Sequence, residues 1–169
     1  ALRLDIESWR WAGVPFYVRA GKRLPTTALE AMVELRPPPR MLFSGADSWL
    51  PQPNVIRLRL GDGAGITMTV QAKQPGRQIA TRPVDLSVDF DTVLGRRDHA
   101  YVRLLDDALD GDAHRFARED MVEQAWRVVG PVLDDDRPVH PYQPGSWGPA
   151  AADDILSAGR WRAPQNSSR

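Results

Sequence analysis

The hydrophobic period changes once along the chain, and this change constrains the fold more than any other feature of the sequence. Before residue 91, apolar side chains alternate with polar ones in several stretches, which is typical of strands with one apolar face. After Asp98 they recur at the spacing of helices. Strands grouped before helices favour an α+β domain, with a large, mostly antiparallel sheet and helices packed on one of its faces.

The expected strands are short and are separated by glycine and proline. The Gly61-Asp62-Gly63 turn predicts a β-hairpin between the two strands that flank it. Pro15 indicates that its strand lies at an edge or begins there. The run Arg36-Pro37-Pro38-Pro39-Arg40 is interpreted either as a polyproline ligand or as a loop, and residues 41–53 as a loop. The strands are predicted over residues 2–6, 14–18, 30–35, 56–60, 66–70 and 84–90.

Two longer helices are expected after the strands. The first has Asp98 as its predicted N-cap and ends at Gly111. The second begins near Glu119 and should bend or end near Gly130, because Pro131 lacks a backbone N–H. A short helix at about 150–156 precedes a polar tail. The chain contains no internal repeat and no long linker, so residues 1–169 are interpreted as a single domain.

Composition argues against several functional classes. The 22 basic and 22 acidic residues give a net charge of zero, which does not support bulk attraction to nucleic acid or to an anionic membrane. The absence of cysteine removes disulfide scaffolds, thiolate metal sites and cysteine nucleophiles. No apolar run approaches the roughly 18 residues of a membrane span, and the first residues lack the apolar core of a signal peptide. A soluble, cytoplasmic protein is therefore expected.

The basic part of the chain contains the sharpest candidate for a ligand contact. Residues 1–40 carry seven basic and four acidic side chains, whereas residues 98–136 carry four basic and eleven acidic ones. Within the basic segment, Lys22 follows Gly21 directly after a predicted strand. A lysine ammonium suits a phosphate or sugar hydroxyls. The surrounding spacing is not that of a Walker A loop, so an ordinary surface lysine is the alternative interpretation.

The other polar and aromatic candidates have structural interpretations. His99, His114 and His140 lie in different elements without zinc-ligand spacing, so they are interpreted as surface or structural residues. The acidic runs 106–107 and 134–136 are interpreted as solvated faces rather than cation sites. Trp9 and Trp11 are expected on one face of an extended segment, where packing is favoured over stacking on a sugar. The sequence predicts neither a self-sufficient catalytic centre nor a metal site.

Several sequence blocks together resemble one enzyme family. The run from Trp9 to Leu24 closely resembles the W-x-G-V-P-F-x-x-R-x-G-K-x-L signature of glucose-6-phosphate dehydrogenase. The likeness covers nearly the whole chain but concerns only the family's C-terminal domain. Further family-like blocks follow in the same order as in the family, namely Asn54-Val55-Ile56-Arg57, Lys73-Gln74-Pro75-Gly76, Ala100-Tyr101-Val102-Arg103-Leu104, Phe116-Ala117-Arg118-Glu119-Asp120, Ala125-Trp126-Arg127 and Pro141-Tyr142-Gln143-Pro144-Gly145-Ser146-Trp147-Gly148-Pro149.

This resemblance implies an activity and an arrangement of parts. The family oxidises C1 of glucose 6-phosphate, passes the hydride to NADP and yields 6-phosphogluconolactone, the first step of the oxidative pentose phosphate pathway. Its coenzyme is bound by an N-terminal Rossmann domain, and its general base is a histidine in a segment that bears an H-Y-L-G-K motif. Neither feature occurs in this sequence. We therefore expect the C-terminal portion of a larger enzyme, inactive alone, which supplies one wall of the sugar-phosphate pocket and the sheet of a homodimer or larger homo-oligomer.

The resemblance also suggests roles for individual residues. Lys22 matches the family lysine that contacts the substrate, so it is expected to position glucose 6-phosphate. Arg57 matches an arginine that contacts a second, structural NADP in some members, and a purely structural arginine is the favoured alternative. Thr27 stands where the family often has a basic residue, which leaves open a divergent paralogue acting on another sugar phosphate. A non-catalytic binding or assembly module is the remaining alternative.

Overall fold

The chain forms two compact units, each built from segments that are distant in the sequence. The computed structural model describes residues 1–37, 52–61, 63–76, 80–95, 98–136, 138–157 and 159–164. The first unit consists of Ala1–Lys22 and Arg97–Ser157, and the second of Arg23–Arg96 and Ala158–Arg169. Lys22 is thus the last residue of the first unit's N-terminal segment. A single domain over residues 1–169 stays a prediction.

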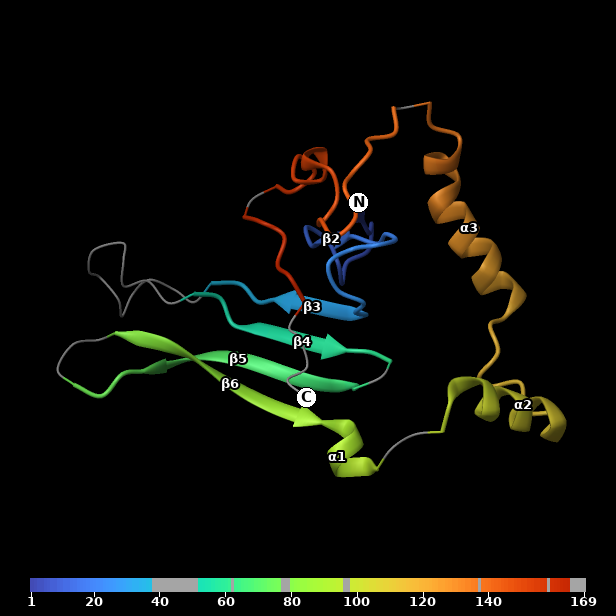
Figure 1. Ribbon diagram of the computed structural model, residues 1–169, viewed down its shortest axis with the longest axis horizontal. Helices are drawn as coiled ribbons and strands as arrows, with labels where there is room; N and C mark the ends of the chain where they lie inside the picture. The colour runs from blue at the N-terminus through green and yellow to red at the C-terminus, as the bar shows by residue number, and fades with distance from the viewer. Residues whose placement is uncertain are drawn as a thin grey trace. The chain divides into compact units, whose positions relative to one another are not determined.

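The second unit contains a four-stranded antiparallel sheet (Figure 1). Each strand pairs with the next one along the chain, in the order β3 (Glu30–Glu34), β4 (Val55–Arg59), β5 (Gly65–Lys73) and β6 (Thr81–Asp89). Gly61 and Gly63 adopt φ values of 82° and 69° in the connection between β4 and β5, a conformation that favours glycine. The predicted hairpin is therefore confirmed. Residues 38–51, which include most of the proline-rich run, lie outside the described residues.

The alternation along the strands gives this sheet one polar and one apolar face. Arg57 is opposite Thr67, and Thr67 is opposite Ser87, so these three side chains share the polar face. Val55 lies on the same face two residues before Arg57, and Val55 and Thr67 are both buried. The apolar face carries large side chains that remain exposed within the second unit: Val33, Ile66, Leu86 and Val88. The small core of this unit therefore lies on the polar side of the sheet.

Helix α1 (Phe90–Leu94) directly follows β6 and was not predicted (Figure 1). The strand was expected to continue to Phe90, but it ends at Asp89, whose side chain caps the helix. The Asp89 carboxylate accepts hydrogen bonds from the Thr92 backbone N–H at 2.9 Å and from the Thr92 hydroxyl at 3.1 Å. These bonds lower the pKa of Asp89. A helix of five residues is too short to produce a recognisable period in the sequence.

The first unit combines a two-stranded antiparallel sheet with two helices and one short helical turn. In the sheet, Leu4 is opposite Phe16, and Pro15 begins the second strand, as the sequence predicted. The elements are β1 (Leu2–Asp5), β2 (Pro15–Val18), α2 (Ala100–Asp110), α3 (Glu119–Leu133) and the 3₁₀ helix η3 (Ala150–Ala152).

Two predictions about the helix ends are wrong, and a third is wrong in one of its two alternatives. The N-cap of α2 is His99 rather than Asp98, since the His99 Nδ1 atom accepts a hydrogen bond from the Tyr101 N–H. Helix α3 does not end near Gly130 but continues through Pro131 to Leu133, because a proline this close to the C-terminus removes a single hydrogen bond. The Asp134 N–H still donates to the Gly130 carbonyl at 3.2 Å. A bend of the helix at Pro131 stays a prediction. The helix expected at 150–156 is a single 3₁₀ turn.

The fold class is as predicted. Six strands and three α-helices are present in the described ranges, all strand pairs are antiparallel, and the class is α+β. Because α2 and α3 belong to the first unit and the four-stranded sheet to the second, the packing of helices on one face of that sheet stays a prediction.

Replacing Gly65 by alanine should destabilise the sheet. A Cβ at this position would lie 2.5 Å from the Val88 carbonyl oxygen and 2.7 Å from an Arg59 guanidinium nitrogen. Because the carbonyl belongs to the paired strand, it can move only if the β5–β6 pairing shifts. We expect Gly65→Ala to lower the free energy of unfolding by about 1–3 kcal/mol in urea denaturation. The control is Gly130→Ala in α3, where nothing lies within 4 Å of the new Cβ. It should be neutral or stabilising, and equal losses in both variants would contradict the prediction.

Candidate functional site

Lys22 is exposed at the end of the segment that follows β2. Three residues separate it from Val18, the last residue of that strand. Within the described residues, its ammonium forms no ion pair with a carboxylate. An exposed ammonium without a protein counterion is available to an anionic ligand. The structure therefore leaves Lys22 free for the role that the sequence suggested, although it does not test that role.

The Lys22 backbone, in contrast to its side chain, is held by a residue from the other end of the first unit. The Tyr142 hydroxyl donates a hydrogen bond to the Lys22 carbonyl oxygen at 2.7 Å. The next residue, Arg23, adopts φ 54°, and it is the only non-glycine residue with positive φ in the described part of the chain. This conformation is unfavourable for a residue with a Cβ. Neighbouring contacts must therefore maintain the turn at Lys22.

A second contact joins the same two segments. The Arg19 guanidinium lies over the Trp147 ring, with its central carbon 4.6 Å from the ring centroid, a distance suited to a cation–π interaction. Partial burial lowers the pKa of Arg19, and the nearby Asp153 carboxylate opposes this shift. The turn that carries Trp147 is closed locally, because the Ser146 N–H donates to the Gln143 carbonyl at 3.1 Å. Residues 142–147 thus contact the stretch from Arg19 to Lys22 at two points.

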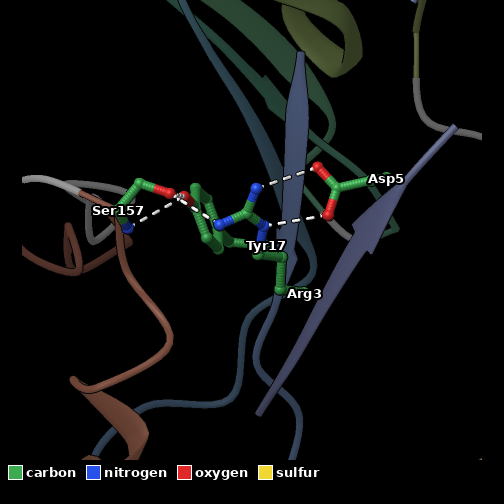
Figure 2. A network of polar contacts seen from close by, with 4 residues as sticks. All are labelled: Arg3, Asp5, Tyr17 and Ser157. Carbon is green, nitrogen blue, oxygen red and sulfur yellow. Dashed lines mark hydrogen bonds and ion pairs between the residues drawn. The ribbon is translucent and has the colours of Figure 1, made fainter. Parts of the chain in front are cut away.

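A polar network joins β1 and β2 to the end of the first unit (Figure 2). The Arg3 guanidinium donates two hydrogen bonds to the Asp5 carboxylate, at 2.9 and 3.1 Å, and a third to the Ser157 hydroxyl at 2.7 Å. The Ser157 N–H donates to the Tyr17 hydroxyl oxygen at 3.0 Å, and the two hydroxyls are 2.9 Å apart. The bonds to Ser157 lower the pKa of Tyr17. This network fixes the strand that leads to Lys22.

Arg57, the second candidate, lies on the polar face of the other sheet and is already paired. Its Nη1 atom is 2.6 Å from Glu30 Oε1, and the two side chains are only 11% and 7% exposed. The same nitrogen donates to the Ala163 carbonyl at 3.2 Å. The adjacent Arg162 pairs with Glu34 at 2.6 Å, so the C-terminal segment of the second unit lies against this face. The Arg57 guanidinium is thus engaged by residues of its own unit.

The tryptophans near the N-terminus do not lie on an extended segment, so that prediction is wrong. Residues 8–13 form turns, in which the Trp11 N–H donates to the Ser8 carbonyl at 3.1 Å and the Val14 N–H to the Trp11 carbonyl at 2.9 Å. Trp11 packs edge-to-face on Phe16, with ring centroids 5.2 Å apart. Trp9 is 91% exposed. The two rings therefore have different environments, and only Trp11 packs on its own unit.

The histidines and acidic runs occupy structural or exposed positions. His99 caps α2 and stacks on Tyr101, His114 lies 2.7 Å from the Asp112 carboxylate, and His140 is exposed. Asp107 is not solvated as predicted, because it is buried and paired with Arg115. No group of three or more histidine, aspartate or glutamate side chains in the described ranges could hold a metal ion. Among the same residues, no helix is long and apolar enough to cross a membrane.

The sequence reasoning missed Tyr142 and Trp147 as parts of the candidate site. Both belong to the Pro141–Pro149 block that was noted for its family likeness alone. No local pattern connects that block with Lys22, because the hydrogen bond joins residues 120 positions apart. The available signal was the combination of a tyrosine, a tryptophan and two glycines in a segment outside any predicted helix or strand.

Comparison with known proteins gives one consistent result. Residues 1–162 match the family model described as "Glucose-6-phosphate dehydrogenase, C-terminal domain". The chain is similar to glucose-6-phosphate 1-dehydrogenase 1 of Mycobacterium tuberculosis strain H37Rv, with 41% identity over 97% of this chain. It is also similar to the glucose-6-phosphate 1-dehydrogenase of Treponema pallidum, with 40% identity over 99% of this chain. The chain spans only about a third of the length of these curated relatives, 34% in both cases.

Solved structures agree with this result. A crystal structure of glucose-6-phosphate 1-dehydrogenase from Mycobacterium avium superposes with a TM-score of 0.81 and 37% identity, over 98% of this chain and 35% of that one. A structure of glucose-6-phosphate dehydrogenase in complex with its substrate glucose-6-phosphate gives a TM-score of 0.75 and 25% identity, over 96% of this chain and 34% of that one.

The contacts of Arg57 predict that Glu30→Gln destabilises the second unit. The substitution keeps the side-chain size but leaves a largely buried guanidinium without its counterion. We expect the free energy of unfolding to fall by about 2 kcal/mol in urea denaturation. Glu34→Gln is the matched control, because its ion pair with Arg162 is largely exposed and should contribute less than about 1 kcal/mol. Equal effects of the two variants would show that the burial of the Arg57 pair has no energetic consequence.

Proposed function

Because the chain belongs to the glucose-6-phosphate dehydrogenase family and corresponds to its C-terminal domain, we propose that it acts as part of an NADP-dependent enzyme that oxidises glucose 6-phosphate to 6-phosphogluconolactone. The observation that carries this proposal is the match over residues 1–162, combined with relatives that are about three times as long. A similar solved structure, named as a complex with glucose 6-phosphate, supports the choice of substrate.

The redox chemistry is proposed to reside in the rest of the enzyme. NADP supplies the hydride acceptor, and it is bound mainly by an N-terminal Rossmann domain that is outside this chain. The general base belongs to the same part of the polypeptide. The histidines of this chain support that division, because His99 caps a helix and His114 pairs with Asp112 at the surface. The chain's own contribution is therefore binding and positioning of the substrate.

Within this chain we propose that Lys22 contacts the substrate. Its exposed ammonium has no counterion among the described residues, so binding a phosphate would not require an existing ion pair to break. A charge-assisted hydrogen bond would orient the sugar phosphate and favour its negative charge. Thr27 is exposed and offers a hydroxyl where the family often has a cation. We propose that phosphate affinity depends more on Lys22 here than in relatives that have a second basic residue. The alternative substrate is another sugar phosphate.

For Arg57 we propose a structural role, in which it holds the C-terminal segment on the sheet. Its guanidinium is bonded to Glu30 and to the Ala163 carbonyl. Thr69 and Asp85 on the same face bond each other at 2.6 Å, and Thr67 and Ser87 at 3.1 Å. Binding of a second, structural NADP at Arg57, which the resemblance implied, would compete with the bonds of the Arg57 Nη1 atom to Glu30 and to the Ala163 carbonyl. The residues present therefore fit such a nucleotide poorly.

The exposed apolar surface supports further partners within the enzyme. Leu86 is 58% exposed on β6, and Trp126 is 59% exposed on α3, so each unit leaves large apolar side chains uncovered by its own residues. Surfaces of this kind are usually covered in the complete protein. We propose that the enzyme's N-terminal domain and a second copy in a homodimer or larger homo-oligomer cover them, and that the enzyme works in the cytoplasm.

Substitution of Lys22 tests its proposed contact with the substrate. In the full-length enzyme, Lys22→Ala should raise KM for glucose 6-phosphate about tenfold or more, because it removes a charge-assisted contact with the phosphate. Steady-state kinetics with varied glucose 6-phosphate measure this change. Lys73→Ala is the control, since the Lys73 ammonium donates to the carbonyls of Gln74 and Gly76 within its own turn. An unchanged KM in Lys22→Ala would disprove the assignment.

The proposed division of labour makes a second prediction. The purified 169-residue chain should show no glucose-6-phosphate-dependent reduction of NADP, followed by absorbance of the reduced coenzyme, because the general base and the coenzyme site lie elsewhere. Addition of a separately produced N-terminal domain is the positive arm of the test. Turnover by a highly purified preparation of the chain alone would refute the division.

A further inference from the structure

We infer that Tyr142 is a positioning residue for Lys22, an inference that rests on the substrate role proposed for that lysine. The starting observation is the contrast between the two parts of Lys22. Its side chain is exposed and forms no ion pair within the described residues, whereas its carbonyl oxygen accepts a 2.7 Å hydrogen bond from the Tyr142 hydroxyl. The position of the flexible ammonium is therefore limited mainly by the backbone from which it extends.

That backbone is in a conformation that needs support. Arg23 follows Lys22 with φ 54°, which is unfavourable for any residue except glycine. Conformations of this kind persist where surrounding contacts determine them, and they are common where a side chain must point in a particular direction. The Lys22 carbonyl accepts its hydrogen bond from Tyr142, a residue of a distant segment of the chain. Loss of this bond would allow the turn to relax.

Two further residues hold the segment that contains Tyr142 in place. Trp147, five residues further along the chain, lies against Arg19 in the segment that leads to Lys22. Ser157, later in the same segment, bonds both Arg3 and Tyr17 (Figure 2). These contacts hold the part of the first unit that follows Tyr142 against β1, β2 and the segment that leads to Lys22. A tyrosine ring has few rotamers, so its hydroxyl can fix a carbonyl at a defined position.

The alternative is that Tyr142 only contributes to stability. The two interpretations differ in what happens when the hydroxyl alone is removed. A purely structural hydroxyl would change stability and leave substrate affinity as it was, or would affect affinity whether or not Lys22 is present. A positioning hydroxyl acts through Lys22, so its effect on substrate affinity must disappear when the Lys22 ammonium is gone.

The experiment is a double-mutant cycle in the full-length enzyme with Tyr142→Phe, Lys22→Ala and the combination of both. We expect Tyr142→Phe to raise KM for glucose 6-phosphate about threefold to tenfold, as for the loss of one hydrogen bond, with kcat and KM for NADP nearly unchanged. In the Lys22→Ala background, Tyr142→Phe should cause no further increase. Hydrogen exchange of the peptide around residues 18–24 should become faster in Tyr142→Phe. The control is Tyr101→Phe, because Tyr101 is 71% exposed and its hydroxyl has no recorded partner among the described residues.

The outcomes separate this inference from the proposed function. If Lys22→Ala leaves KM for glucose 6-phosphate unchanged, the substrate role of Lys22 is wrong, and the positioning role fails with it. If Lys22→Ala raises KM but Tyr142→Phe does not, only the positioning role is overturned. Additive effects of the two substitutions would also overturn it, since they would show that Tyr142 acts independently of Lys22. A non-additive pair, together with faster exchange around Lys22, would support the inference.

Discussion

The first unit depends on hydrogen bonds that bring residues near 142 and 157 back to the N-terminal strands. A two-stranded hairpin such as β1–β2 is at best marginally stable by itself in water. The bonds from Ser157 to Arg3 and Tyr17, and from Tyr142 to the Lys22 carbonyl, attach it to a segment more than a hundred residues away. Each bond alone contributes modestly in exposed surroundings. Together they hold β2 and the short segment that leads from β2 to the turn at Lys22.

The second unit is stabilised differently from the first. Its buried residues lie on the polar face of the sheet. Arg57 and Glu30 bury opposite charges together, and the Ala163 carbonyl takes part in the same arrangement. A buried ion pair is weak evidence for stability, since desolvation offsets much of the attraction. The segment that covers the face is better specified by the ion pair of Arg162 with Glu34, because a backbone carbonyl such as that of Ala163 is available in any segment. The apolar face, in contrast, leaves Leu86 and Val88 exposed.

Local sequence patterns predicted the strands and the helices, but not the contacts between distant segments. Alternation and the glycines at 61 and 63 identified the β4–β5 hairpin, and the helical period located α2 and α3. Errors occurred where a single side chain decides the outcome, as with the Asp89 cap that ends β6 and begins α1. Lys22 could be singled out because the signature surrounds it, whereas the contact from Tyr142 depends on tertiary structure alone. Family resemblance identified the correct block without indicating what its residues do.

The sequence change at Thr27 gives the positioning of Lys22 added importance. Where two cations contact one phosphate, the second contact restricts the anion even if the first is mobile. Under the proposed substrate role, the threonine at position 27 supplies no charge, so the geometry of Lys22 matters more. A lysine side chain has several rotatable bonds, so its ammonium is well placed only if the backbone below it is fixed. The bond from the Tyr142 hydroxyl to the Lys22 carbonyl is the contact that we infer to supply that fixation. Under the substrate role proposed for Lys22, the fixed backbone at this residue is therefore what limits where its ammonium can lie.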